Sequence, residues 1–274
     1  MFLPLLLMLQ TTAPSGVVMP TMDEVRLDEC LALAASDPQS GIVDANDWLR
    51  KNGGWRARQC LGFAYHKQGN HKAATDAFAA AVTDAQSSGA DSIAVGKLRL
   101  QAGNAALVAG DIVPAITHFN TAIGSGAFSG EALGEIYIDR ARANGVVGDM
   151  AAAKADLAKA HELVPQDPLG WLLSATLARR EGDLTRARAD IAIAAKLAAK
   201  DPAIALEAGN IAAEAQDFAG ARTNWQAVVD LSPASPYAAT AKGHLKELDA
   251  FEAEGKAEAA KPAVPQPKPA SPSR

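Results

Sequence analysis

Aromatic side chains are scarce in this chain and make up only 5% of its 274 residues. With so few large rings, a folded core must depend on small residues that let helices approach closely. The rings that remain to fill the larger gaps are Phe78, Phe119, Trp171, Phe218 and Trp225. Between clusters of glycine, asparagine and aspartate, the chain consists mainly of strong helix formers such as alanine, leucine, lysine and glutamate. This composition predicts an all-α fold.

The common catalytic motifs are also absent. No serine stands in a Gly-x-Ser-x-Gly turn. The glycine-rich stretch 124–130 lacks the preceding strand and the following Lys-Ser/Thr pair of a phosphate-binding loop, so it is interpreted as a flexible connector. Acidic residues fall at predicted helix caps and on faces expected to be exposed, where dipole and solvation effects explain them. We therefore expect a non-enzyme without a cofactor.

A metal site has little support. The five histidines are scattered, and only His66 and His71 lie near each other, on the two sides of a turn at Gly69. A metal-binding pair is one interpretation of these two residues, and solvated turn histidines are the favoured one.

A basic, aromatic-containing stripe of the kind that binds nucleic acid is missing as well. The chain has 26 Lys and Arg against 31 Asp and Glu, a formal net charge of −5 and a pI of about 5.6. Neutralising phosphates requires clustered cations. Nucleic acid is therefore excluded as the expected partner.

The apolar run at Met1–Leu9 is too short to span a bilayer as a helix. Its length suits the hydrophobic core of a secretory signal, with small residues around a candidate cleavage point after Ser15. No Lys or Arg precedes Arg26, however, and no cysteine follows the run for lipid attachment. We expect residues 1–20 to be a signal or apolar segment and the protein to be periplasmic or secreted. The alternative is a cytoplasmic protein with an unstructured apolar N-terminus.

The most informative feature present is a helical hairpin repeated five times. Each repeat has an alanine followed four residues later by a large apolar residue, and a small residue twelve positions before that alanine. The alanine and apolar pairs are Ala74/Phe78, Ala115/Phe119, Ala153/Leu157, Ala187/Ile191 and Ala221/Trp225, and the small residues are Gly62, Gly103, Ala141, Ala175 and Gly209. One hairpin cannot bury its apolar face alone, so the hairpins are expected to stack with a continuous core.

The first repeat resembles the tetratricopeptide repeat (TPR) family through Leu61, Gly62, Tyr65, Gly69, Ala74 and Phe78, and the fourth adds Trp171 and Ala175. Turn glycines at 69, 110, 148 and 182 are 41, 38 and 34 residues apart, against a family period of about 34. The resemblance covers roughly 55–233. It implies a right-handed superhelical solenoid of about five hairpins. We expect this domain at 21–250, with an irregular helix pair at 22–35 and 41–51 and a capping helix after Ser235-Pro236. A disordered Ala/Pro-rich tail is expected at 251–274.

The family resemblance further implies that the first helix of each hairpin lines a concave groove. The residues expected to line it are Gln59, Phe63, His66, Lys67, Asn104, Arg142, Thr176, Arg179, Arg180 and Asn210. Four residues before the inward positions of the later repeats lie Leu100, Ile138, Leu172 and Leu206, which either line the groove or pack against the next helix. The arrangement with which some family members clamp a C-terminal carboxylate is absent, because Gln59 and Phe63 occupy its slots.

This lining predicts a protein–protein interaction scaffold that binds a peptide or protein in its groove. The alternatives are a self-associating structural module and an accessory subunit of an envelope enzyme complex. The proline-rich segment 261–274 is interpreted as a spacer, although two Pro-x-x-Pro spacings also fit a ligand for another domain.

The chain has only two cysteines, and both fall in predicted first helices. Cys30 belongs to the irregular pair and Cys60 to the first repeat. First helices of successive hairpins are neighbours in such a stack, so a disulfide is sterically reasonable, and export would favour it. The alternative is two buried thiols that act as small hydrophobic side chains.

Overall fold

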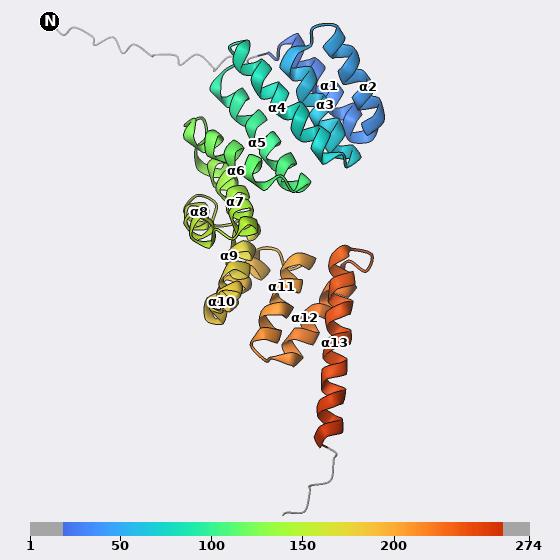
Figure 1. Ribbon diagram of the computed structural model, residues 1–274, viewed down its shortest axis with the longest axis vertical. Helices are drawn as coiled ribbons and strands as arrows, with labels where there is room; N and C mark the ends of the chain where they lie inside the picture. Colours follow the sequence, from blue (N-terminus) through green and yellow to red (C-terminus); the bar gives the residue numbers. More distant parts are fainter. Residues whose placement is uncertain (1–18, 260–274) are drawn as a thin grey trace, which may run out of the picture. The chain divides into compact units, whose positions relative to one another are not determined.

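The computed structural model describes residues 19–259, and this part of the chain is built from helices without strands (Figure 1). The described residues divide into two compact units, a first unit up to Ala105 and a second unit from Ala106, with the boundary inside α5. The helices are α1 (Met22–Ser36), α2 (Pro38–Arg50), α3 (Gly54–Gln68), α4 (His71–Ser87), α5 (Ser92–Ala109), α6 (Ile112–Gly124), α7 (Gly130–Val147), α8 (Met150–Leu163), α9 (Pro168–Arg180), α10 (Leu184–Leu197), α11 (Pro202–Glu214), α12 (Phe218–Leu231) and α13 (Pro236–Ala259). The predicted all-α fold of helical hairpins is confirmed.

The irregular first pair forms α1 and α2. Thr21 and Glu24 form a capping box at the start of α1, and the Asp37 side chain caps α2 with Pro38 in its first turn. The expected start of this second helix at residue 41 was therefore wrong, because Asp-Pro begins the helix and does not merely break the chain. Gly41 lies inside α2, where a Cβ atom would come within 2.5 Å of the Ala34 Cβ, so glycine permits the close approach of α1 and α2.

Small residues of the first helices pack against the large anchors of the second helices, as the repeat spacing predicts. A Cβ atom on Gly62 would lie 2.8 Å from the Phe78 ring, and one on Gly209 would overlap the Trp225 ring. In α7 and α8, Ala141 shares a buried cluster with Ala153 and Leu157. In α9 and α10, the equivalent cluster contains Ala175, Ala187 and Ile191.

The turns use the same chemistry repeatedly. Gly69, Gly110, Gly148 and Gly182 adopt positive φ angles of 80° to 85°, and Gln216 takes this conformation in the last hairpin with φ of 60°. An asparagine or aspartate follows each of these residues and precedes the next helix. Entry into α9 and α11 is also alike, since Asp167 and Asp201 cap helices that begin with Pro168 and Pro202.

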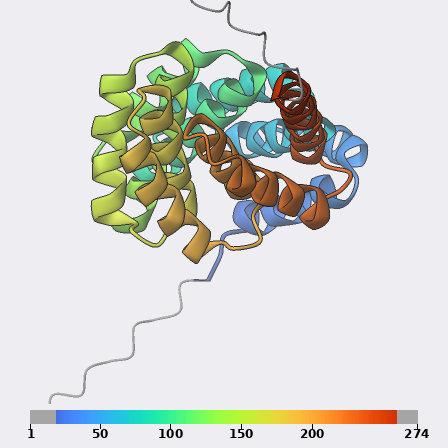
Figure 2. The same ribbon diagram turned by 90° about the horizontal axis from the view of Figure 1, so that it is seen from below.

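The capping helix α13 packs on α12 through Ala241, Leu245 and Leu248 of the predicted apolar face (Figures 1 and 2). Tyr237, the fourth residue of that face, is 44% exposed. The helix continues through 251–259, so this part of the expected tail is helical, as suits its strong helix formers. The rest of the tail and the apolar segment at 1–18 lie outside the described residues.

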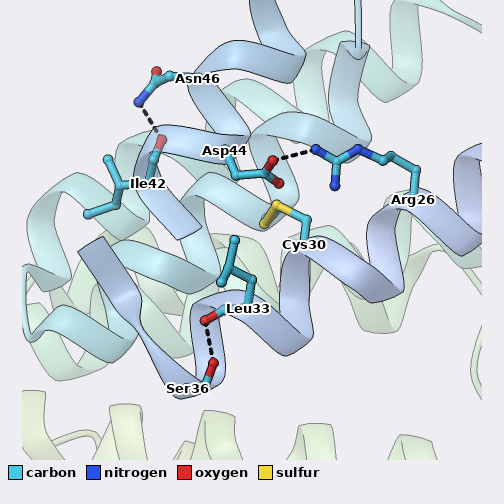
Figure 3. Close-up of a disulfide and its surroundings, with 8 residues drawn as sticks. Arg26, Cys30, Leu33, Ser36, Ile42, Asp44 and Asn46 are labelled. Carbon is cyan, nitrogen blue, oxygen red and sulfur yellow. Dashed lines mark hydrogen bonds and ion pairs between the residues drawn. A yellow bond between two sulfur atoms is a disulfide. The ribbon is translucent and has the colours of Figure 1, made fainter. Parts of the chain in front are cut away.

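A disulfide joins Cys30 of α1 to Cys60 of α3, with Cα atoms 6.1 Å apart (Figure 3). Both cysteines are fully buried among Ala34, Ala57 and Leu61. Nearby, Arg26 of α1 donates to Asp44 of α2 at 2.6 Å. Among residues 19–259, no helix combines the length and apolar character that crossing a membrane requires.

Candidate partner-binding surfaces

A hollow of about 790 Å³ opens in the first unit between α1, the start of α3 and the start of α5. Apolar side chains of Leu27, Leu31 and Trp55 line it together with the predicted groove residue Gln59 and with Lys97. The remaining charged residues around it are Asp23, Glu24, Asp28, Arg56 and Asp91. The surface therefore combines apolar contact area with polar and charged groups.

Two predicted groove residues of this unit have buried oxygen atoms without a protein partner. The Gln59 amide donates to Gln101 at 3.0 Å, which leaves the buried Gln59 Oε1 without a donor. The buried Asn104 Oδ1 also has none. A buried acceptor without a hydrogen bond is costly, so these two oxygens mark positions where the folded chain leaves a polar group unsatisfied.

The other three predicted residues of the first unit lie together at the end of α3. Phe63 is half-buried against the core, and the Lys67 ammonium lies 5.5 Å from the centroid of its ring. The pKa of His66 is lowered by partial burial and by the nearby His71 and Lys67. His66 is thus mainly neutral near pH 7, and Lys67 carries the positive charge of this part of the surface.

His66 and His71 have ring centroids 5.1 Å apart and a tilted arrangement. Within residues 19–259, no three His, Cys, Asp or Glu side chains gather in a way that could hold a metal ion. In the described part of the chain, the structure therefore shows a contact between the two imidazole rings and no third side chain that could complete a metal site with them.

In the second unit, three predicted groove residues meet around one small pocket of about 130 Å³. Arg142 comes from α7, and Thr176 and Arg180 come from α9. The rest of the lining is apolar or glycine: Ala141, Gly145, Val146, Ala153, Leu157, Leu173 and Leu177. We call this the α7–α9 pocket.

The two arginines of the α7–α9 pocket are only partly engaged by the protein. Arg142 Nη2 donates to Asp139 at 2.9 Å, and its buried Nε has no partner. Arg180 is exposed and makes a single hydrogen bond of 3.4 Å, to the Gly145 carbonyl. The Thr176 hydroxyl donates to the Leu172 carbonyl one turn earlier. The pocket thus combines a mainly apolar lining with two guanidinium groups that the protein engages only in part.

Arg179 and Asn210 belong to a separate network between α9 and α11. Arg179 makes two hydrogen bonds to the buried Glu207, at 2.7 and 3.3 Å, and a third to Glu214. Asn210 donates to Glu207 and accepts from the Trp225 indole at 3.1 Å. The positive charge expected from Arg179 is therefore neutralised by glutamates within the protein.

The sequence interpretation missed the buried acidic residues. Asp156 of α8 accepts from Arg140 and Asn144, and Asp190 of α10 accepts from Ser174. Together with Glu207 these are buried, so the expectation that acidic residues lie only at caps and on exposed faces was wrong. The repeat period could have revealed them. Asp156 and Asp190 occupy the same position of two repeats, 34 residues apart, and Glu207 occupies the repeat position that the apolar Leu173 holds one period earlier.

The apolar residues one turn before the groove positions mostly pack within the protein. Ile138 is buried, Leu172 packs on the core shared by α9, α10 and α11, and Leu206 packs on the core shared by α11, α12 and α13. Leu100 is half-buried. The packing alternative therefore holds for the buried Ile138, whereas Leu172 and Leu206 pack on these cores and remain partly exposed.

The chain matches no protein-family model and no curated protein sequence, but solved structures resemble it. PilW, a widely conserved type IV pilus biogenesis factor, has a TM-score of 0.67 and 14% identity, over 81% of this chain and 99% of that one. A thermophilic TPR protein from Thermus thermophilus has a TM-score of 0.57 and 15% identity, over 71% and 98%.

A chain of the APC/C hetero-tetramer Cut9-Hcn1 also matches, with a TM-score of 0.66 and 16% identity over 84% of this chain. The present chain spans 43% of that chain's length. These likenesses concern the fold, and with the hairpin packing described above they show that the chain has the helical-hairpin fold of tetratricopeptide-repeat proteins.

Proposed function

We propose that this protein is a non-catalytic scaffold that binds an extended segment of a protein partner. The segment would lie along the first helix of each hairpin. The observation that carries this proposal is the α7–α9 pocket, where Arg142, Thr176 and Arg180 line a pocket together with mainly apolar side chains. Peptide-binding grooves combine apolar pockets for side chains with polar groups for the backbone in this manner.

The unsatisfied polar atoms support the same function. Gln59 Oε1 and Asn104 Oδ1 in the first unit are acceptors, and Arg142 Nε in the second is a donor. A peptide backbone offers both donors and acceptors, so a segment bound to either unit could pair with such an atom once the side chains that cover it move. A scaffold role also agrees with the TPR architecture.

Site-specific photo-crosslinking in living cells tests the proposal. A benzophenone amino acid is placed at Lys97 beside the hollow of the first unit, at Val146 beside the α7–α9 pocket, and at Ala158 on the second helix α8 as a control. All three positions are exposed. We expect one partner to be crosslinked from Lys97 and from Val146 and not from Ala158. Equal yields from all three positions would contradict groove binding.

Self-association is the second candidate, because α13 exposes aromatic side chains. Tyr237 is 44% exposed and Phe251 is 58% exposed. A crosslinker at Phe251 should then give an adduct of twice the chain mass, and the sedimentation coefficient should rise with concentration. An adduct with an enzyme subunit from Lys97 or Val146 would instead identify the protein as an accessory subunit.

We also propose that the protein functions in an oxidising compartment such as the periplasm or the extracellular space. The disulfide between Cys30 and Cys60 supports this location, since disulfides persist mainly in such compartments. Thiol labelling of protein denatured directly from intact cells tests it. Two unreactive sulfurs before reduction and two reactive ones afterwards are expected, and labelling without reductant would contradict the location.

A further inference from the structure

We propose that the α7–α9 pocket recognises an aliphatic side chain flanked by a carboxylate in the partner segment. This inference rests on the proposed function, because it assumes a protein ligand, and it names the chemistry that this ligand must carry. Its elements are the size of the pocket, the charge of its rim and the open space at Gly145.

The size of the pocket selects one aliphatic side chain. Its volume of about 130 Å³ is close to the roughly 150 Å³ of an engineered apolar cavity that holds a benzene molecule. Leu157, Leu173 and Leu177 supply most of its apolar lining, and Val146, which is 61% exposed, extends it toward the surface. A leucine, isoleucine or methionine fits this space, whereas tryptophan is too large.

The charge of the rim selects an acidic neighbour for that side chain. Both charged residues that line the pocket are arginines. Arg180 is exposed and held only by its 3.4 Å hydrogen bond to the Gly145 carbonyl, so it can turn to a ligand without breaking an ion pair. A guanidinium binds a carboxylate through two parallel hydrogen bonds, which makes it selective as well as attractive. A segment with lysine beside its aliphatic residue would be repelled.

Gly145 leaves space beside the pocket that a larger residue at this position would occupy. A Cβ atom built on this residue meets no atom within 4 Å. Gly145 lies within α7 and has no positive φ angle, so a larger residue there suits the helix. Replacing Gly145 by leucine should therefore obstruct the pocket while preserving the fold. Gly243 of α13 also has open space around a Cβ position and does not line the pocket, so it provides a matched control.

Methyl NMR of the full-length protein with short capped peptides tests the inference. The probe is acetyl-Ser-Glu-Leu-Glu-Ser-amide, and its variants carry alanine for leucine or lysine for both glutamates. We expect the acidic leucine peptide to shift the methyl resonances of Leu157, Leu173 and Leu177 in a saturable manner. The alanine peptide should bind about tenfold more weakly, and the lysine peptide should cause no saturable shift.

Three variants locate the binding. Gly145→Leu should abolish the response and Gly243→Leu should retain it, with circular dichroism confirming that both are folded. Arg180→Gln should weaken binding by about three- to tenfold and remove most of its dependence on salt. Equal binding of the acidic and lysine peptides, unchanged binding by folded Gly145→Leu, or no binding of the acidic peptide would each overturn the inference.

The peptide-binding experiment and the crosslinking experiment can fail independently of each other. If the peptides fail while Lys97 and Val146 still crosslink one partner, the scaffold function stands and only the assigned recognition chemistry is wrong. If crosslinking is equal at Ala158 as well, groove binding itself fails.

Discussion

Glycine residues inside the helices of this chain serve two opposite purposes. Gly62 and Gly209 lie where a neighbouring ring leaves no space for a Cβ atom, so they allow two helices to approach closely. At Gly145 an added Cβ atom would meet nothing within 4 Å, so packing does not require glycine there, and glycine weakens its own helix. The same residue type thus supports the core in one position and keeps a surface pocket open in another.

Alanine substitutions should separate these purposes. Gly62→Ala forces the buried Phe78 ring to move and should lower the free energy of unfolding by about 1–3 kcal/mol, as overpacking does. Gly145→Ala should instead raise it by about 0.5–1 kcal/mol through helix propensity. Thermal melts of both variants and the wild type measure the difference. Equal shifts in the same direction would contradict the packing described for Gly62.

Histidine protonation provides a second residue-scale prediction. The His161 ring stacks on Trp171 with centroids 3.8 Å apart, and burial lowers the pKa of His161 below its ordinary value of 6.5. The imidazole of His161 therefore binds a proton more readily in the unfolded chain than in the folded chain. The stability that neutral His161 contributes is lost as the pH falls through 6.5 and below. His66, whose pKa is also lowered, acts in the same direction.

We expect the melting temperature of the wild type to fall between about pH 7.5 and about pH 5.5. The His161→Phe variant keeps a flat ring against Trp171 and should show a smaller fall, with the remainder including the contribution of His66. Melting curves across this range provide the measurement. An identical pH dependence in the variant would show that His161 titrates as it does in the unfolded chain.

At the scale of the helices, polar links hold neighbouring elements together inside an alanine-rich core. The Arg179–Glu207 pair joins α9 to α11, and its side chains are 19% and 9% exposed. Arg140 of α7 joins Asp156 of α8 in a similar pair. Small side chains let helices pack closely, but their surfaces differ little in shape, so several alignments of two helices would fit almost equally well. We expect these ion pairs to favour one register between the helices.

A double-mutant cycle tests the α9–α11 link. Arg179→Leu leaves the Glu207 carboxylate buried without its cation and should cost about 3–5 kcal/mol. Adding Glu207→Leu should restore most of that loss, since it replaces the ion pair by apolar side chains of similar volume. Urea unfolding of the two single variants and the double variant provides the coupling energy. Additive effects would show that the two residues act independently.

The exposed partner in the same network provides a control. Glu214 is 45% exposed, so Glu214→Gln should change the free energy of unfolding by less than about 1 kcal/mol.

At the scale of the whole molecule, stability is expected to be local. In a repeat protein each hairpin contacts mainly its neighbours, so a perturbation in one place spreads little along the chain. The disulfide lies in the first unit and closes a separation of 30 residues between α1 and α3. Within α1 itself, only Cys30 and Ala34 are buried. The attachment of α1 therefore depends strongly on the cross-link.

Removal of the disulfide should loosen α1 and leave the second unit intact. The Cys30→Ser and Cys60→Ser double variant loses a cross-link worth about 3.6 kcal/mol by loop-closure entropy. Amide hydrogen exchange should accelerate in α1, α2 and α3 and remain unchanged from α9 to α12. Faster exchange in both units would contradict local stability. The wild type treated with reductant serves as a second route to the same state.

Much of this architecture could be predicted from the sequence because the relevant signals are local and periodic. The small residues and the anchors recur at a fixed spacing, and the pairing of Gly62 with Phe78 follows from that spacing. Helix formers at 251–259 could have placed the end of α13 correctly. Asp37-Pro38 carried the signal of a capped helix, although it was interpreted as a break.

The polar contacts could not be predicted in the same way. Arg179 and Glu207 are 28 residues apart and meet only once two hairpins are stacked. The candidate site was predicted in part: Arg142, Thr176 and Arg180 do meet at one pocket, whereas Arg179 and Asn210 are held by neighbouring side chains. Gly145 lines the pocket with an open Cβ position, a property that no sequence motif expresses.

The matching entries into α9 and α11 have an evolutionary consequence. Asp167-Pro168 and Asp201-Pro202 are the same dipeptide, 34 residues apart, and each aspartate accepts from the backbone N–H of the residue two positions after it. A duplication or deletion with both breakpoints at this dipeptide would add or remove one whole hairpin and recreate the helix start at the junction. A gene of this kind can therefore change the length of the encoded array by recombination, without first inventing a new turn.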